Sequence, residues 1–379
     1  MINTYNIISR LVRIFYLILF PIYSNVALAV APIEESVIDT HHKYVVLSID
    51  GGGVRGIIPA RILQEIEQRT GKPIYQLVDM ISGNSTGGLI SLALVTPAET
   101  SNNVQDDIAK TARYTAQDLV ELYKNRSSEI FDRSTLWKIR TGMGVWGAKY
   151  DRSNLDNILS EMFKNVLLSD TLKPAMVLSY SLSEGEPHFW TTRIAKTSDK
   201  HDFFLKDIAA ATSAAPTYFA PKEVVNKDGS SKSYEADGGI FANDPASAAI
   251  SEMYRAFPNI DRNDILLISI GSGKVKLTSP INSVKDSGVI GWVLKANLID
   301  VMMGASSYIS DWESSILVNA NEIRLQIDID PKFGALDNTN QNNLKALLAA
   351  TEEYIEKNTH IIDDICKKLL EHFQNPILY

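Results

Sequence analysis

Short apolar runs recur along the chain and predict the strands of a buried sheet. The clearest three are Tyr44–Ile49, Leu77–Ser82 and Ile265–Ile270. Further strands are predicted at Ala175–Leu182, Pro187–Arg193 and Glu322–Ile327. The turn-rich stretch Asn226–Ser233 predicts the tip of a hairpin.

Between the strands, apolar residues follow helical spacing. After the first strand they recur every three or four positions up to Gly71, at Ile58, Ile62, Leu63 and Ile66. Further helices are predicted at Leu89–Val95, 113–125, 153–164, Phe204–Ala211, 289–318 and 342–373. Because strand, turn and helix repeat in this order, we expect a three-layer α/β/α fold with a mostly parallel central sheet.

The N-terminal segment does not fit this pattern. A basic start, an apolar run from Ile14 to Tyr23 and the small-x-small sequence Ala27–Ala29 follow one another. This arrangement predicts a secretory signal peptide over residues 1–29, and therefore a secreted or periplasmic protein, with an uncleaved membrane anchor as the alternative. Residues 30–43 are then a polar leader, and residues 44–379 a single catalytic domain with a helical C-terminal part.

Composition narrows the function classes. The chain has 379 residues, with 37 Lys and Arg against 45 Asp and Glu and a formal net charge of -8. This acidic balance argues against a dedicated nucleic-acid binder, which usually carries a basic surface. The single cysteine, Cys366, excludes an intramolecular disulfide and a cysteine-based zinc or iron–sulfur site.

The sequence Gly83-x-Ser85-x-Gly87 lies between a predicted strand and a predicted helix and has the form of a nucleophile elbow. A serine at such a corner has a strained backbone, so its neighbours must lack side chains. The corner presents the hydroxyl beyond the sheet, and the helix behind it offers amide donors. The alternative is a glycine-rich turn with a capping serine, and the position after a buried strand favours the elbow.

The glycine-rich loop Asp50–Gly56 allows two interpretations. Its G-x-G-x-x-G spacing matches a dinucleotide-binding fingerprint, but the acidic partner, Asp79, would lie within a strand. Alternatively, the amides of Gly51, Gly52 and Gly53 form an oxyanion hole beside the serine of the neighbouring strand. The second interpretation is favoured because it explains both loops.

A serine nucleophile needs a base, and the sequence offers two kinds. His360 and His372 have the chain order of Ser-Asp-His hydrolases, but both fall within a predicted helix. Asp237 instead follows a predicted strand and precedes Gly238 and Gly239, which leave space around it. A carboxylate can act as the general base where burial raises its proton affinity.

Together, the segments Asp50–Gly56, Gly83–Gly87 and Asp237–Gly239 resemble the patatin-like phospholipase family in motif order and spacing. Two further segments add to the resemblance, Ala211–Phe219 and Asn321–Gln326. The likeness extends over about residues 44–350. Its motifs are specific, and the motif positions show no departure from the family pattern.

The resemblance implies a lipid acyl hydrolase of the phospholipase A type, which cleaves fatty-acyl esters of phospholipids or related glycerolipids without a metal or other cofactor. Ser85 would be the acylated nucleophile, Asp237 the base, and Gly51, Gly52 and Gly53 the oxyanion hole. Supporting roles fall to Arg55, which would hold the loop or add positive potential, and to Gly83, Gly87 and Gly238. Two alternatives stay open: a Ser-Asp-His esterase, and a storage or lipid-binding protein with an idle catalytic apparatus.

Residues 126–150 are locally basic within an acidic protein. The charged residues are Arg126, Arg133, Lys138, Arg140 and Lys149, against Glu129 and Asp132. The aromatic residues Phe131, Trp137, Trp146 and Tyr150 lie among them. Cations mixed with aromatic rings are typical of a membrane-contacting surface or lid. An ordinary, partly buried excursion of the chain is the alternative.

Overall fold

The computed structural model describes residues 44–98, 111–144, 146–275 and 298–375, with the single positions 285 and 288. The described residues belong to one compact unit. The signal peptide, the leader, most of the polar loop that follows the second predicted strand–helix pair, and the start of the helix predicted at 289–318 lie outside them. The expectations for the N-terminal segment therefore stay predictions.

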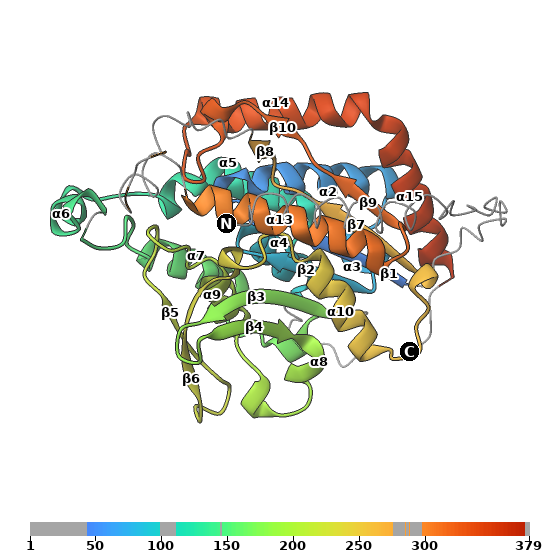
Figure 1. Cartoon of the computed structure of the whole chain (residues 1–379), viewed down its shortest axis with the longest axis horizontal. Coiled ribbons are helices and arrows are strands. Elements are labelled where there is room, and N and C mark those ends of the chain that lie inside the picture. The colour runs from blue at the N-terminus through green and yellow to red at the C-terminus, as the bar shows by residue number, and fades with distance from the viewer. Residues whose placement is uncertain are drawn as a thin grey trace, which may run out of the picture. The chain divides into compact units, whose positions relative to one another are not determined.

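A mostly parallel sheet forms the middle layer (Figure 1). Within the described residues it has eight strands, in the order β5-β6-β3-β2-β1-β7-β9, with β4 paired to β3. Their bounds are β1 (Tyr44–Ile49), β2 (Met80–Asn84), β3 (Ala175–Ser181), β4 (Glu186–Thr191), β5 (Lys222–Val225), β6 (Lys232–Asp237), β7 (Ile265–Ile270) and β9 (Glu322–Leu325). A separate pair joins β8 (Lys274–Val275) to β10 (Asp328–Ile329).

Helices cover both faces of this sheet. Those of the first half are α2 (Ile57–Thr70), α3 (Ile74–Leu77), α4 (Thr86–Val95), α5 (Ala116–Ile130), α6 (Thr135–Arg140) and α7 (Ser153–Phe163). Those of the second half are α8 (Thr192–Ala195), α9 (Leu205–Thr212), α10 (Ala246–Ala256), α13 (Leu298–Leu317), α14 (Gln341–Lys357) and α15 (Thr359–Gln374). No helix among the described residues is both long and apolar enough to cross a bilayer.

Alternating side chains of β1 enter two separate cores. Val45, Leu47 and Ile49 pack in the larger core, which also contains residues of α2, α4, α5, α7, α14 and α15. Val46 points to the other face, where it joins Ile250 of α10 in a smaller core. Because consecutive side chains of a strand point to opposite faces, this apolar run must be covered on both sides. The predicted three-layer α/β/α fold is confirmed.

The structure places several elements differently from the pattern. The strand predicted at Leu77–Ser82 begins at Met80, because Leu77 ends the short helix α3. The single helix predicted at 342–373 is two helices, α14 and α15, with Asn358 between them. The backbone amide and the side chain of Asn358 both donate to the carbonyl of Tyr354 in the last turn of α14.

Candidate active site

The strand order places a crevice at the carboxyl end of β1. The chain passes from β1 to β2 and β3 on one side, and β7 and β9 lie on the other side. In open parallel sheets, ligands bind where the strand order reverses in this way. The glycine-rich loop follows β1 at this point, and the Ser85 corner follows β2. Strand β6 ends here at Asp237, across β3 from the end of β2.

Ser85 forms the corner between β2 and α4. Its backbone has φ 52° and ψ -125°, a conformation that costs a residue with a side chain about 1–3 kcal/mol. The Ser85 amide donates to the side-chain hydroxyl of Thr212 at 2.8 Å, which fixes the corner to α9. The strained geometry and the strand–turn–helix context are those of a nucleophile elbow.

Gly83 and Gly87 allow this corner to pack against the sheet. A Cβ atom added at Gly83 would lie 2.2 Å from the carbonyl oxygen of Gly87. One added at Gly87 would lie 2.1 Å from the carbonyl oxygen of Ile49, the last residue of β1. Both neighbours are backbone atoms, so rotating a side chain cannot relieve either clash. The glycines are therefore required by the close approach of β1, β2 and α4.

Asp237 is a buried carboxylate in this crevice. One of its oxygens accepts hydrogen bonds from the Gly239 amide at 2.8 Å and from the Asn84 side chain at 3.3 Å. Burial raises the pKa of Asp237 to about 6, and contact with the Ser85 hydroxyl opposes the rise. A side chain at Gly238 would clash with the backbone, because an added Cβ would lie 2.8 Å from the carbonyl oxygen of Leu178. A carboxylate with this pKa is ionised at neutral pH and can accept a proton.

The glycine-rich loop supplies fewer free donors than the sequence suggests. The Gly51 amide donates to the carbonyl of Asn243 at 2.9 Å, so it is already engaged. For the amides of Gly52 and Gly53, the described residues provide no acceptor. Gly53 has φ 57°, a conformation that favours glycine. An oxyanion hole at this loop therefore rests on Gly52 and Gly53 rather than on all three residues.

Arg55 folds back on the loop that contains it. Its side chain is almost fully buried, and it donates to the carbonyls of Gly52 at 3.3 Å and Gly273 at 3.5 Å. The next residue on the N-terminal side, Val54, donates its amide to the carbonyl of Leu336 at 2.8 Å. Of the two roles considered for Arg55, the geometry matches that of holding the shape of the loop.

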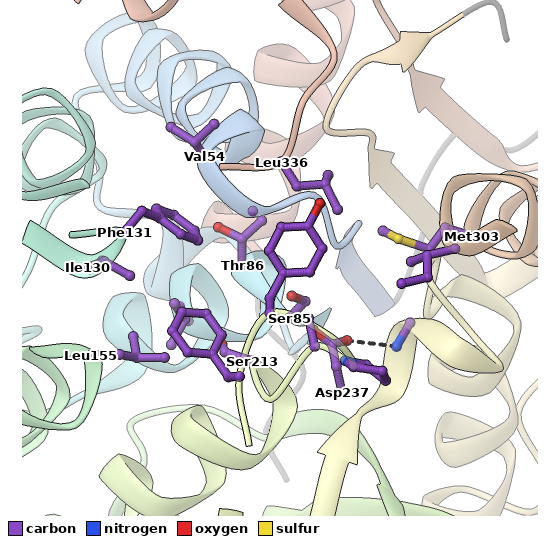
Figure 2. Close-up of a pocket in the computed structure, with 18 of the residues that line it drawn as sticks. Val54, Ser85, Thr86, Ile130, Phe131, Leu155, Ser213, Asp237, Met303 and Leu336 are labelled. Atoms are coloured by element: carbon purple, nitrogen blue, oxygen red, sulfur yellow. Dashed lines mark hydrogen bonds between the residues drawn. The ribbon is translucent and has the colours of Figure 1, made fainter. Parts of the chain in front are cut away.

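Ser85 and Asp237 line one pocket whose other walls are largely apolar (Figure 2). The pocket encloses a volume of about 80 Å³. Figure 2 shows Phe131 and Leu155 on one side of Ser85 and Met303 of α13 on the other. Further apolar wall residues are Leu89, Ile130, Phe219, Ile240, Ile299 and Leu336. A largely apolar lining beside two polar groups is typical of a site for a mostly apolar ligand.

Three residues at the site were not singled out from the sequence. Asn84 contacts Asp237, Thr212 holds the Ser85 amide, and the Asn243 carbonyl holds Gly51. Asn84 lies inside the elbow motif, and Thr212 lies inside the segment that resembles the family. Their positions in these segments could therefore have indicated a role at the site. Asn243 had none, because its contact joins two loops that are far apart in the chain.

The candidate histidines lie away from Ser85. Nε2 of His372 is 3.0 Å from the carboxylate of Asp79, which also accepts the amide of Val45 at 2.8 Å. Asp79 and Val45 lie at the start of β2 and β1, whereas Ser85 follows the far end of β2, about 17 Å along a five-residue strand. His360 is exposed in the first turn of α15. The geometry gives neither histidine the place of a triad base, and Asp79 lies at the wrong edge of the sheet for a nucleotide site.

A family model described as Patatin-like phospholipase matches residues 47–250, which include Ser85 and Asp237. The chain is 29% identical over 356 residues to patatin-like protein 2 of Oryza sativa subsp. indica, covering 84% of this chain and 85% of that protein. It is 29% identical over 300 residues to an Arabidopsis thaliana protein named probable inactive patatin-like protein 9, covering 74% and 73%.

A solved structure also matches this chain. It is that of VipD from Legionella pneumophila, with a TM-score of 0.39 and 15% identity, covering 83% of this chain and 67% of that one. At these values the match supports no argument about the site.

Proposed function

The chain belongs to the patatin-like phospholipase family, and we propose that it is a phospholipase A-type lipid acyl hydrolase that acts through a Ser85–Asp237 dyad. The observation that carries this proposal is the convergence of the two side chains in one apolar pocket. Ser85 lies on a strained corner, and Asp237 is buried with a raised pKa. Since one relative is named as probably inactive, family membership alone does not establish turnover.

In the acylation step, Asp237 accepts the proton of the Ser85 hydroxyl as its oxygen attacks the ester carbonyl carbon. The carbonyl oxygen becomes the oxyanion of a tetrahedral intermediate. When the bond from carbon to the glycerol oxygen breaks, the protonated Asp237 returns the proton to that leaving oxygen. The products of this step are a lysolipid and an acyl-Ser85 ester. Water then attacks the ester by the same route and releases the fatty acid.

The amides of Gly52 and Gly53 are the proposed oxyanion donors. In support of this role, Gly53 lines the pocket that contains Ser85, and Gly52 directly precedes Gly53 in the chain. Each preorganised donor of this kind contributes about 2.7–4 kcal/mol to the stability of the transition state. The engagement of Gly51 with Asn243 then serves to fix the loop rather than to bind the oxyanion.

The apolar pocket is the proposed binding site for the acyl chain. Its walls include side chains of α4, α5, α7 and α13. Burying a methylene group of the chain contributes about 0.8 kcal/mol. Substrates with longer acyl chains should therefore bind more tightly until the chain fills the pocket.

Labelling with a fluorophosphonate tests the dyad. We expect stoichiometric labelling of the wild type, none of Ser85→Ala, and labelling of Asp237→Asn that is at least about 100-fold slower, because general-base catalysis contributes at least that factor. Ser91→Ala is the matched control, since Ser91 is a buried serine of α4 that does not line the pocket. It should label like the wild type.

Three outcomes would contradict the proposal. Labelling of Ser85→Ala would assign the nucleophile elsewhere, and unchanged labelling of Asp237→Asn would remove the base. A folded wild-type protein that is not labelled at all would favour the storage or lipid-binding alternative.

We further propose that α6 and the residues after it contact an anionic phospholipid bilayer. Leu136, Ile139 and Trp146 are 79%, 73% and 85% exposed. Lys138 and Arg140 lie in the same short helix and supply charge complementary to anionic headgroups. The helix begins shortly after Phe131, which lines the acyl pocket, so a bilayer at α6 would bring lipid toward the pocket.

The other basic residues of the segment 126–150 contact groups within the protein, Arg133 by lying over the ring of Tyr150. Arg126 pairs with Glu129 and Glu161, and Lys149 pairs with Asp337. These contacts narrow the proposed contact surface from the whole segment to α6 and Trp146.

A further inference from the structure

One arginine contacts carboxylates from two loops of the candidate active site. Asp50 is the residue between β1 and the glycine-rich loop, and Asp244 lies in the segment that follows Asp237. Arg324 lies in β9, which pairs with β7 at the edge of the sheet beyond β1. It contacts both carboxylates, although the three residues come from distant parts of the chain.

The contacts of Arg324 are short and directional. Its two terminal nitrogens donate to the two oxygens of Asp50 at 2.8 and 2.6 Å, a bidentate arrangement. The first of these nitrogens also donates to the Ser269 hydroxyl at 2.6 Å and lies 3.3 Å from a carboxylate oxygen of Asp244. The fork of a guanidinium group makes this set of contacts possible, and a single ammonium group could not reproduce it.

The two carboxylates flank a contact that shapes the oxyanion loop. Gly51 directly follows Asp50, and Asn243 directly precedes Asp244. The Gly51 amide donates to the Asn243 carbonyl at 2.9 Å, which joins the two loops. Arg324 therefore holds both sides of this junction and fixes Gly52 and Gly53 relative to the segment that begins with Asp237.

The charges explain why the arginine is needed at this junction. The side chains of Asp50 and Asp244 are 2% and 0% exposed, and that of Arg324 is 16% exposed. Burial raises the pKa of both carboxyls, Asp244 to about 7, and Arg324 opposes the rise in each case. Without the arginine, the two buried carboxylates would repel each other, and the loops would separate or take up protons.

We propose that Arg324 is a positioning residue for ester hydrolysis, which sets the distance between the oxyanion loop and the Asp237 segment through Asp50 and Asp244. This inference rests on the proposed function. Arg324 acts through these two residues and does not touch the reacting atoms. We expect Arg324 to affect the transition state more than substrate binding, because negative charge develops on the carbonyl oxygen only after Ser85 begins to attack.

Steady-state kinetics on a soluble short-chain nitrophenyl ester tests this role, with rates expressed per active site titrated by fluorophosphonate. A displacement of catalytic groups by 1 Å can cost a factor of about 100. We therefore expect Arg324→Met to lower kcat about 100-fold while KM changes less than about threefold. Arg324→Lys should recover part of the loss, since it keeps the charge but not the fork.

Arg69→Met is the matched control. Arg69 also bridges two carboxylates, those of Glu65 at 2.8 Å and Asp363 at 2.7 Å, but it lies near the end of α2, away from the crevice. We expect wild-type kcat per titrated site for this variant. A comparable loss in both arginine variants would mean that the effect is a general loss of stability and would overturn the proposal.

The remaining outcomes are equally decisive. Wild-type kcat in Arg324→Met overturns the proposal, as does a rise in KM with unchanged kcat. If Arg324→Met does not fold, Arg324→Lys decides, and wild-type kcat per titrated site in that variant overturns the proposal. A wild-type enzyme without turnover or labelling overturns the proposed function itself, whereas normal wild-type turnover with unaffected Arg324 variants overturns this inference alone.

Discussion

Asp237 is buried, and burial disfavours the charged form of its carboxyl group. The pKa that results sets the pH range in which Asp237 can accept a proton. Its pKa is raised to about 6, mainly by burial, although the Ser85 hydroxyl, the Gly239 amide and Asn84 favour the charged form. A more exposed carboxylate would be ionised over a wider pH range, but it would be a weaker base. A pKa near 6 keeps the carboxylate ionised at neutral pH, with enough proton affinity to act as a general base.

The activity of the wild-type enzyme should therefore fall in mild acid. In the proposed mechanism the ionised form of Asp237 is the active one, so kcat/KM should be constant above about pH 7 and fall about tenfold per pH unit below about pH 6. Stopped assays on the soluble ester from pH 4.5 to 9 measure this, with circular dichroism at each pH to confirm the fold. An acid limb near pH 4 would contradict the proposed environment of Asp237.

At the scale of single residues, the sequence reveals the contacts that are local. The strain at Ser85 could be predicted because Gly83 and Gly87 lie beside it, and both prove to be required by backbone contacts. The engagement of the Gly51 amide could not be predicted, because its acceptor, Asn243, lies in a different loop. A run of three glycines indicates available amides but does not indicate which of them are already bonded.

Among the helices, α15 anchors the edge of the sheet opposite to the active site. It is amphipathic, and Ile362, Ile365 and Leu369 pack in the larger core. His372 in its last turn is buried and contacts Asp79 at the start of β2. The apolar spacing predicts the helical pattern from 342 to 373, but it does not encode the break at Asn358, where the backbone has φ -111° and ψ 28°.

Replacement of His372 should affect stability rather than catalysis. We expect His372→Ala to lower the free energy of unfolding by about 2 kcal/mol, because a buried polar contact to Asp79 is lost. Guanidinium denaturation measures this change, and kcat per titrated site should stay at the wild-type value. His360→Ala is the control on the same helix, and its exposed side chain should allow a change of less than about 0.5 kcal/mol. A selective loss of kcat in either variant would restore the histidine-triad alternative.

Helix α13 turns a row of serines toward the protein and several apolar side chains toward solvent, the reverse of a usual amphipathic helix. Its serines face the protein and bond to it: Ser306 and Ser307 to Asn243, Ser310 to Ser247, and Ser314 to Glu322. Its exposed apolar residues are Val301, Met302, Tyr308, Ile309, Trp312 and Ile316. Apolar spacing predicts this helix, but the rule that the apolar face turns inward would assign the wrong face. The polar partners that fix the orientation come from α10, β9 and the loop after β6, which spacing within the helix does not reveal.

For the whole molecule, charge is distributed unevenly. The chain carries a net charge of -8, which disfavours general adhesion to an anionic bilayer. The exposed apolar and basic residues of α6 form a local exception. Membrane contact should therefore depend on a small surface and on ionic strength.

Binding to vesicles that contain anionic phospholipid tests this dependence. We expect Ile139→Ser with Trp146→Ala to weaken binding at least about tenfold, since two exposed apolar side chains would no longer enter the interface. Hydrolysis of the soluble ester should not change. Sedimentation at low and high salt measures binding, and high salt should weaken the wild type because Lys138 and Arg140 are screened.

Leu182→Ser provides the control for this measurement, since Leu182 is 51% exposed and follows β3, away from α6. It should bind like the wild type. Equal losses of vesicle binding and ester hydrolysis in the α6 variant would contradict the proposed contact.

The central position of β1 has a consequence for fragments of this protein. The part that matches the family model, residues 47–250, contains Ser85 and Asp237 but neither β7 nor β9. In the intact sheet β1 pairs with β2 on one side and with β7 on the other. A fragment that ended at residue 250 would leave the apolar strand β1 at the edge, with a row of unpaired amides and carbonyls that can recruit another chain. The segment that contains the proposed dyad therefore depends on strands outside it to cover the edge of β1.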